Sequence, residues 1–133
     1  MRLTGQKPKA VDFEPQTLGQ HVKKQRLILG LQQKRVAAQI GVTVDTLRNW
    51  EKGKTRPVVA HMPAIIEFLR YDPTPQPENL AERLRARRRA LGWSIRRAAL
   101  ALGVDPGTWA DWERGKPITL AQHRAAVAAF IRQ

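Results

Sequence analysis

Residues 29–57 of the chain read LGLQQKRVAAQIGVTVDTLRNWEKGKTRP. The first half predicts a short helix over about Gln33–Ile40, because its apolar residues recur at helical spacing. Gly41 follows as a turn residue that suits a left-handed backbone. Thr43 can then cap a second short helix that runs to about Lys52, and Gly53 ends it. The residues expected to face inward are Val36, Ala37, Ile40, Leu47 and Trp50.

Helices are also expected on both sides of this stretch. Residues 17–20, TLGQ, form a capping box, in which a hydroxyl accepts from the third amide and a Gln reaches back. The helix that begins there stops at Gly30, and a further helix over about His61–Arg70 closes the core. The inward residues of these two helices are expected to be Leu18, Val22, Leu29, Ile65, Phe68 and Leu69. No segment alternates like a strand, so the sequence predicts an all-α fold.

The chain repeats this pattern once. Residues 18–71 align with residues 80–133 without a gap, and 17 of the 54 aligned positions are identical. The identities include the turn glycines and a Trp-Glu pair. A long ungapped match of this kind indicates duplication of one folding unit. We therefore expect two units, each small enough to bury little core.

A proline-rich sequence separates the two units. Residues 71–78, YDPTPQPE, carry three prolines and predict a stiff, extended linker. Helix caps in the second unit are expected at Asn79, Ser94 and Asp105. The expected organisation is an N-terminal arm (1–16), a first unit (17–71), a linker (72–78) and a second unit (79–133). In the arm, Val11 and Phe13 are candidates to dock onto the first unit.

The composition favours a polyanionic partner. The 133-residue chain has a formal net charge of +13, and residues 18–71 contribute +7 of it. Such a balance is most often found with nucleic acid as the partner, although charge that only keeps a protein in solution is the alternative. Without cysteine there is no disulfide framework and no thiolate site. No apolar run approaches the ~18 residues of a membrane span, which predicts a cytoplasmic protein without membrane contact.

Motifs of catalysis and cofactor binding are not evident in the sequence. There is no P-loop, GxSxG or HExxH motif. His21, His61 and His123 are far apart and have no ligand spacing around them. The acidic residues are too few and too scattered for a carboxylate dyad. We therefore expect no enzyme activity, no cofactor and no metal site.

The opening stretch resembles the Cro/cI-type helix-turn-helix family, also called the XRE family. The resemblance rests on a helix, a glycine-containing turn and a second helix, followed by W-E-x-G-K in register. It covers residues 18–71 strongly and residues 80–133 more loosely. It implies two tandem four-helix units of the lambda-repressor-like fold, a compact bundle that places its third helix in the DNA major groove. It also implies a transcription regulator, such as a repressor, of bacterial or phage type.

The resemblance assigns base contacts to the outward face of the third helix in the first unit. The matching positions follow Thr43 and hold Val44, Asp45, Arg48 and Asn49. Asn49 can form a bidentate pair with adenine, Val44 can meet a thymine methyl group, and Arg48 can reach guanine or phosphate. Asp45 either accepts from a cytosine amino group, repels the DNA backbone, or stays at the helix N-terminus as a dipole partner.

Other positions carried over from the family support the third helix or contact phosphate. Gln33 matches a Gln that touches phosphate and braces the third helix. Arg26 and Glu51 match a largely buried ion pair, and they recur as Arg88 and Glu113. Two unrelated surface charges are the alternative for each pair. Further phosphate contacts are expected from Lys34, Lys52, Lys54 and Arg56, with a solvated charge as the alternative for any single lysine.

The second unit lacks most of these reading residues. The four reading positions hold Pro106, Gly107, Ala110 and Asp111, and Ile95 replaces Gln33. The first helix of this unit instead offers candidate phosphate contacts at Arg83, Arg85 and Arg89. Trp93 and Ile95 are candidates either for a subunit interface or for the local core. We expect a unit that kept the fold, lost sequence readout, and either grips phosphates or packs against a partner.

These observations together predict a transcription regulator whose first unit reads double-stranded DNA and whose second unit supports it. Two alternatives stay open. One is an antitoxin-like subunit that sequesters a partner protein and binds DNA only with it. The other is a sequence-tolerant protein that coats nucleic acid through its charge. The family usually binds as a homodimer to palindromic sites, while a tandem monomer can bind one asymmetric site. A DNA-binding role also predicts association with the nucleoid.

Overall fold

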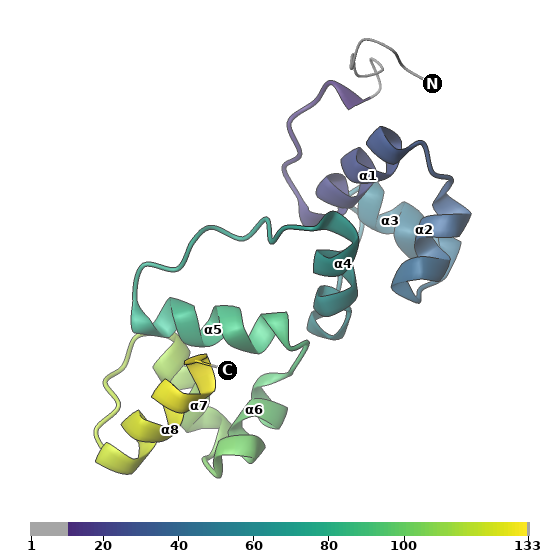
Figure 1. Ribbon diagram of the computed structural model, residues 1–133. Helices are drawn as coiled ribbons and strands as arrows, with labels where there is room; N and C mark the ends of the chain where they lie inside the picture. Colours follow the sequence, from purple (N-terminus) through teal and green to yellow (C-terminus); the bar gives the residue numbers. More distant parts are fainter. Residues whose placement is uncertain (1–10, 133) are drawn as a thin grey trace. The chain divides into compact units, whose positions relative to one another are not determined.

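A computed structural model describes residues 11–132, and the chain falls into two compact units that divide between Pro73 and Thr74. Among the described residues every regular element is a helix, which confirms the all-α prediction. Each unit contains four α-helices, and the first unit has a short 3-10 helix before its last one (Figure 1). The two units are described one at a time below.

The helices of the first unit begin and end close to the residues that the sequence predicts. They are α1 (Leu18–Leu29), α2 (Gln33–Ile40), α3 (Val44–Glu51), the 3-10 helix η2 (Val59–His61) and α4 (Met62–Leu69). Thr17 caps α1, because its hydroxyl accepts from the Gln20 amide at 3.1 Å. The Gln20 side chain reaches back to the Gln16 amide at 2.6 Å. At the turn after α2, Gly41 has a φ of 92°, and Thr43 caps α3.

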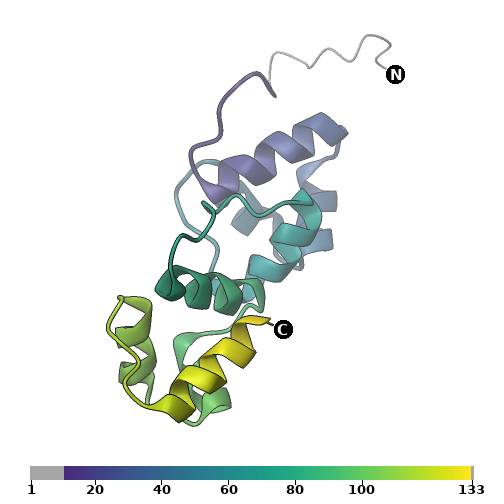
Figure 2. The same cartoon turned by 60° about the vertical axis from the view of Figure 1, so that its left-hand side comes forward.

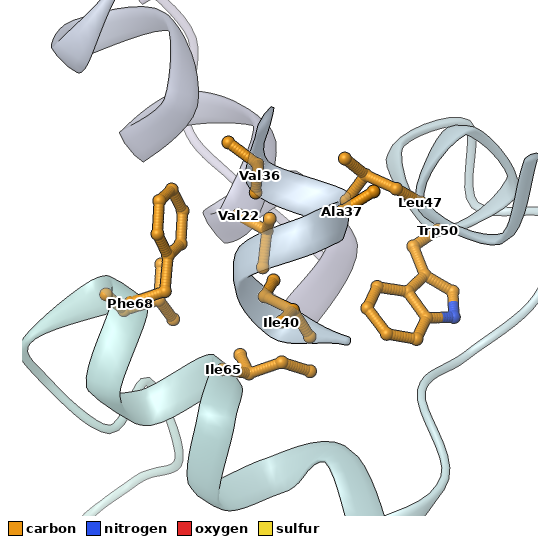
Figure 3. Close-up of a cluster of buried hydrophobic side chains, with 9 residues drawn as sticks. Val22, Val36, Ala37, Ile40, Leu47, Trp50, Ile65 and Phe68 are labelled. Carbon is orange, nitrogen blue, oxygen red and sulfur yellow. The ribbon is translucent and has the colours of Figure 1, made fainter. Parts of the chain in front are cut away.

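The core of the first unit lies where these four helices meet (Figure 3). Its buried side chains are Val22, Val36, Ala37, Ile40, Leu47, Trp50, Ile65, Phe68 and Leu69. Leu29 was expected among them but is half exposed, at 51%. Leu29 is the last residue of α1, and Leu31, beyond the left-handed Gly30, packs against the core in its place. The prediction for Leu29 was therefore wrong, while the other inward residues of the predicted helices are buried or packed against the core.

A glycine allows α1 and α3 to approach each other closely. Gly19 is buried, and a Cβ atom placed on it would lie 1.9 Å from the backbone oxygen of Trp50. No side chain can fit into that space, since the atom it would meet belongs to the backbone of α3. The equivalent residue of the second unit is Ala81. The requirement for glycine is therefore a property of the first unit alone.

The N-terminal segment packs onto the first unit at its described end. Val11 is fully buried, as expected for a docked residue. The Phe13 ring lies 5.8 Å from the ammonium groups of both Lys23 and Lys24, and Lys24 also donates to the Phe13 carbonyl at 2.8 Å. These contacts join residues 11–13 to α1. Residues 1–10 of the expected arm lie outside the described residues.

The second unit repeats the arrangement with α5 (Leu80–Ala90), α6 (Ile95–Leu102), α7 (Pro106–Glu113) and α8 (Ala121–Arg132), drawn from green to yellow in Figure 2. All three predicted caps are formed. The Asn79 side chain accepts from the Glu82 amide, the Ser94 hydroxyl from the Arg97 amide, and the Asp105 carboxylate from the Gly107 amide. Local hydrogen-bonding residues thus fix three of the four helix starts in this unit.

The core of the second unit is more aromatic than that of the first. Its buried side chains are Leu84, Ala98, Ala99, Trp109, Trp112, Val127 and Phe130. Trp93 and Ile95 are partly buried and pack against this cluster, with the Trp93 ring 6.0 Å from that of Phe130. Of the two interpretations of Trp93 and Ile95, the local core is the one that the structure supports.

A histidine on α1 contacts Tyr71, the second residue after α4, and the surroundings of this histidine give a pH prediction. His21 Nδ1 lies 2.8 Å from the Tyr71 hydroxyl. Burial, and secondarily the charge of Lys24, lowers the pKa of His21 below its usual 6.5, against a smaller opposing effect of Glu14. The unfolded chain therefore takes up this proton more readily than the folded one.

The stability that His21 contributes should be fully present above pH 6.5 and should fall as the pH is lowered through 6.5 toward the folded-state pKa. NMR titration of the His21 ring should show a midpoint below 6.5 in the folded protein. Because burial is the largest cause, Tyr71→Phe should leave the midpoint low. A midpoint at or above 6.5 in the native protein would contradict this environment for His21.

Candidate nucleic-acid interface

In the first unit α3 has one face in the core and one face in solvent. Leu47 and Trp50 are buried, and these two residues fix the rotation of the helix about its axis. Of the four positions assigned to base contacts, Asp45 and Arg48 have exposed side chains, at 86% and 47%, and Asn49 is partly exposed. Val44 is only partly exposed and packs against the core, so the outward position expected for it is wrong in part. A helix held in this way can present the same polar side chains to a groove without rearrangement.

A buried ion pair anchors the end of α3. Arg26 Nε and Nη2 donate to the two carboxylate oxygens of Glu51 at 2.7 and 2.9 Å. The Arg26 and Glu51 side chains are only 12% and 4% exposed. Arg26 Nη1 also donates to the Leu31 carbonyl at 3.1 Å. This bidentate contact confirms the predicted pair and ties α1 to the C-terminal end of α3.

Gln33 links the buried pair to the exposed face. Its amide nitrogen donates to Glu51 at 3.0 Å, and its amide oxygen accepts from Arg48 at 3.4 Å. Arg48 also forms an ion pair with Asp45, at 2.8 Å. The pair between Asp45 and Arg48 was not foreseen, although their spacing of three residues on a helix is one at which side chains meet. Gln33 thus braces α3 from the first residue of α2.

Cationic side chains surround this face. Thr43 is exposed at the start of α3, and Lys34, Lys52, Lys54 and Arg56 are exposed as well. Arg35, which was not singled out from the sequence, is also exposed, and the signal that could have found it is its recurrence as Arg97. From Gln33 to Arg56 there are therefore six exposed cations and a single exposed carboxylate, that of Asp45. Such a surface attracts an anionic backbone.

The second unit keeps the buried pair but completes it differently. Arg88 donates to Glu113 at 2.6 and 3.0 Å and to the Trp93 carbonyl at 2.8 Å. The third donor to the carboxylate is the Trp109 indole, at 2.5 Å. Trp109 occupies the position of Leu47, and Ile95 that of Gln33. A core tryptophan therefore supplies the hydrogen bond that a surface glutamine makes in the first unit, and the link to the exposed face is lost.

The reading positions of the second unit offer little to a base edge. Pro106, Gly107 and Ala110 have no polar side-chain atoms, and Asp111 forms ion pairs with Arg114 and Lys116. The Asp111 carboxylate can accept hydrogen bonds but donates none. At the four positions where the resemblance assigns base contacts to α3, α7 therefore has no side chain that can donate a hydrogen bond to a base.

The arginines predicted to touch phosphate on α5 fall into two groups. Arg83 and Arg85 are exposed. Arg89 is partly buried and donates to the Thr74 hydroxyl at 3.1 Å. A neighbour, Arg87, has its Nε atom buried without a hydrogen-bond partner among the described residues. Arg83 and Arg85 are thus the two predicted phosphate contacts on α5 that are open to a ligand.

Residues 11–132 contain neither a metal-binding cluster nor a membrane-spanning helix. No group of three or more His, Cys, Asp or Glu side chains in this range is arranged to hold a metal ion. None of its helices combines the length and the apolar character that crossing a membrane requires.

Comparison with known families matches one domain model to each unit. A model described as "Helix-turn-helix" covers residues 22–76, and a model described as "Helix-turn-helix domain" covers residues 79–132. Neither comparison with curated proteins nor comparison with solved structures found a match. Domains of this type bind DNA, act in transcription regulation and are typically not enzymes. The chain therefore belongs to the helix-turn-helix DNA-binding proteins, with two XRE-like domains in tandem.

Proposed function

We propose that the protein is a sequence-specific transcription regulator that reads duplex DNA with α3 of the first unit. The observation that carries this proposal is the outward face of α3, where Arg48 and Asn49 lie opposite the buried Leu47 and Trp50 that hold the helix in the core. Asn49 pairs with adenine, Val44 contacts a thymine methyl group, and Arg48 reaches guanine or phosphate. This function places the protein at the nucleoid.

Phosphate contacts hold the reading helix in register. Gln33 and Thr43 lie at the starts of α2 and α3, where backbone amides and the helix dipole favour an anion. The cations assigned to phosphate are Lys34, Lys52, Lys54 and Arg56 in the first unit, with the exposed Arg83 and Arg85 of α5 as additional contacts. These contacts position the module and make binding dependent on salt, but they carry no sequence information.

Asp45 takes a supporting role in this proposal. Its carboxylate faces Arg48 across one turn of α3, so it neutralises part of the charge on Arg48 and orients the guanidinium. Asp45 and Gln33 both accept hydrogen bonds from the Arg48 guanidinium, so its side chain can adopt fewer conformations when it meets DNA. Arg48 is therefore better suited to a directed contact than Lys52 or Lys54, for which no hydrogen bond fixes the side chain among the described residues.

A pair of variants separates reading from phosphate contact. Asn49→Ala should weaken binding to the preferred duplex by about 1–3 kcal/mol and relax the preference at one base position. Lys52→Gln should instead weaken binding to all sequences alike and reduce the salt slope by about one. Titrations of both variants on the preferred duplex and on random duplex, at two salt concentrations, distinguish the two effects.

Three outcomes would argue against reading by α3 or point to one of the alternative functions. If Asn49→Ala leaves both affinity and footprint unchanged, α3 of the first unit does not read the bases. A wild-type protein that binds random and selected duplexes equally would be a sequence-tolerant coating protein. A wild-type protein that binds neither until a second protein is added would be an antitoxin-like subunit. The number of half-sites in the footprint shows whether the protein binds as a homodimer or as a tandem monomer.

A further inference from the structure

We propose that Asp111 acts as an internal counter-ion that closes the reading helix of the second unit to DNA. As a consequence each chain would engage duplex DNA through one reading helix, α3, although it contains two helix-turn-helix domains. The conclusion that one helix of the chain reads DNA rests on the proposed function of the first unit. The ion pairs themselves involve Asp111, Arg114 and Lys116, which all lie within the second unit.

The backbone around Asp111 matches that around its counterpart Asn49. The Lys54 amide donates to the Asn49 carbonyl at 2.9 Å, and the Lys116 amide donates to the Asp111 carbonyl at 3.0 Å. In both units the glycine between these groups is left-handed, with φ of 75° and 95°. The two turns therefore hold equivalent residues in equivalent places. Whatever differs between them lies in the side chains.

The side chains differ in one decisive respect. Asp111 Oδ1 contacts the Arg114 guanidinium and lies 3.7 Å from the Lys116 ammonium. Arg114 and Lys116 replace Lys52 and Lys54, and their side chains are 64% and 65% exposed. In the first unit the neutral Asn49 stands at this point, and within residues 11–132 no carboxylate lies at ion-pair distance from Lys52 or Lys54.

A carboxylate in this position has two effects on binding to a phosphate backbone. It already neutralises the two cations, so that fewer counter-ions are released when DNA arrives. It also places a negative charge where the phosphate would lie, and the repulsion between the two negative charges weakens binding. Exposed ion pairs contribute little to stability, so a purely structural role for this cluster would be weak. The electrostatic effect on an incoming polyanion is the stronger consequence of the arrangement.

The charge balance of the two faces agrees with this interpretation. Between Ile95 and Ile118 the exposed cations are Arg96, Arg97, Arg114 and Lys116, against six in the corresponding range of the first unit. Two carboxylates, Asp105 and Asp111, oppose these four cations outside the buried pair. Outside the buried pairs the second-unit range therefore carries a net charge of +2, against +5 for the corresponding range of the first unit.

The test compares two substitutions that remove the same charge from the same helix. Asp111→Asn releases Arg114 and Lys116. Asp105→Asn removes the exposed carboxylate that caps α7, and asparagine caps a helix about as well as aspartate. Asp105 forms no ion pair within residues 11–132. Both variants of the full chain are titrated with a random duplex at about 50 and about 200 mM salt.

Asp111→Asn should make the salt slope steeper by up to about two, which corresponds to roughly ten-fold more loss of affinity between the two salt concentrations. Affinity at the lower salt concentration should rise, whereas Asp105→Asn should leave the slope at its wild-type value. Asp111→Ala should give the same gain as Asp111→Asn. The reverse change in the first unit, Asn49→Asp, should make the slope shallower. Melting curves check that each variant is folded.

Two results would overturn the proposal. One is a wild-type slope in both Asp111 variants. The other is an equal change in Asp111→Asn and Asp105→Asn, which would reflect net charge alone. Since random duplex contains no preferred site, these results do not depend on sequence reading by the first unit. Failure of the proposed function would instead appear as equal binding of wild-type protein to selected and random duplexes.

Discussion

Gly19→Ala should destabilise the first unit by about 2 kcal/mol. The added Cβ would lie 1.9 Å from the Trp50 carbonyl oxygen, and relief requires α1 and α3 to move apart. Overpacking of this kind costs about 1–3 kcal/mol and occasionally more. Against it stands the gain of about 1 kcal/mol when alanine replaces glycine inside a helix. The clash should prevail, because backbone atoms cannot turn aside as a flexible side chain can.

The melting temperature of the first unit should fall by on the order of 10 °C. Thermal unfolding followed by the NMR indole signal of Trp50 reports on the first unit, and the signal of Trp109 reports on the second. The matched control is Ala81→Gly at the equivalent position of the second unit, which should cost only about 1 kcal/mol of helix propensity. A Gly19→Ala protein as stable as the wild type would show that α1 and α3 are not in close contact.

Arg26→Met should be the second strongly destabilising substitution. It leaves the Glu51 carboxylate, which is 4% exposed, with Gln33 as its single remaining side-chain donor. Removing one partner of a buried pair costs about 3–5 kcal/mol, whereas replacing both by apolar residues is often much less costly. Arg26→Met with Glu51→Leu should therefore melt at a higher temperature than Arg26→Met alone. Calorimetry of the two variants measures this difference.

The second unit provides the control for this prediction. Arg88→Met alone and Arg88→Met with Glu113→Leu should show the same order of melting temperatures, because Arg88 and Glu113 are also buried and paired at 2.6 Å. In that unit the Trp109 indole remains as a donor after Arg88 is removed. Equal and negligible shifts for the single and double variants would mean that these pairs are open to solvent.

Local patterns in the sequence predicted most of the fold because they depend on short-range physics. The caps at Thr17, Thr43, Asn79, Ser94 and Asp105 each rely on a side chain that accepts from an amide two or three residues away. The inward residues of α2 and α3 follow from helical spacing alone. The resemblance added the pairing of α1 with the end of α3, which spacing could not have given.

Features that depend on contacts across the fold were harder to foresee. Leu29 has the right spacing for the core, but it ends α1 half exposed, and Leu31 beyond the turn packs there instead. Trp109 stands at the position of the apolar Leu47, yet its indole completes the hydrogen bonding of Glu113. Both depend on where the chain goes after a turn and on which buried group needs a donor, and neither is encoded by periodicity.

The candidate site divides along the same line. That Arg48 and Asn49 face outward could be predicted, because Leu47 and Trp50 define the opposite face. The ion pair between Asp45 and Arg48 could not be predicted. The position of Asp45 was equally compatible with a cytosine contact, with repulsion of the DNA backbone and with a role as a helix-dipole partner. The partners of side chains on an exposed face are set by competing interactions of similar strength, so the sequence alone does not determine which contact forms.

The most direct test of the first unit as the reader is selection of bound sequences from a random duplex pool. The full chain is compared with the double variant Arg48→Ala and Asn49→Ala, which leaves the buried Arg26–Glu51 pair in place. We predict that the wild type enriches a defined half-site and that the folded double variant binds DNA without enriching it. A wild-type pool that stays random, or a double variant that enriches the same half-site, would contradict the assignment of reading to α3.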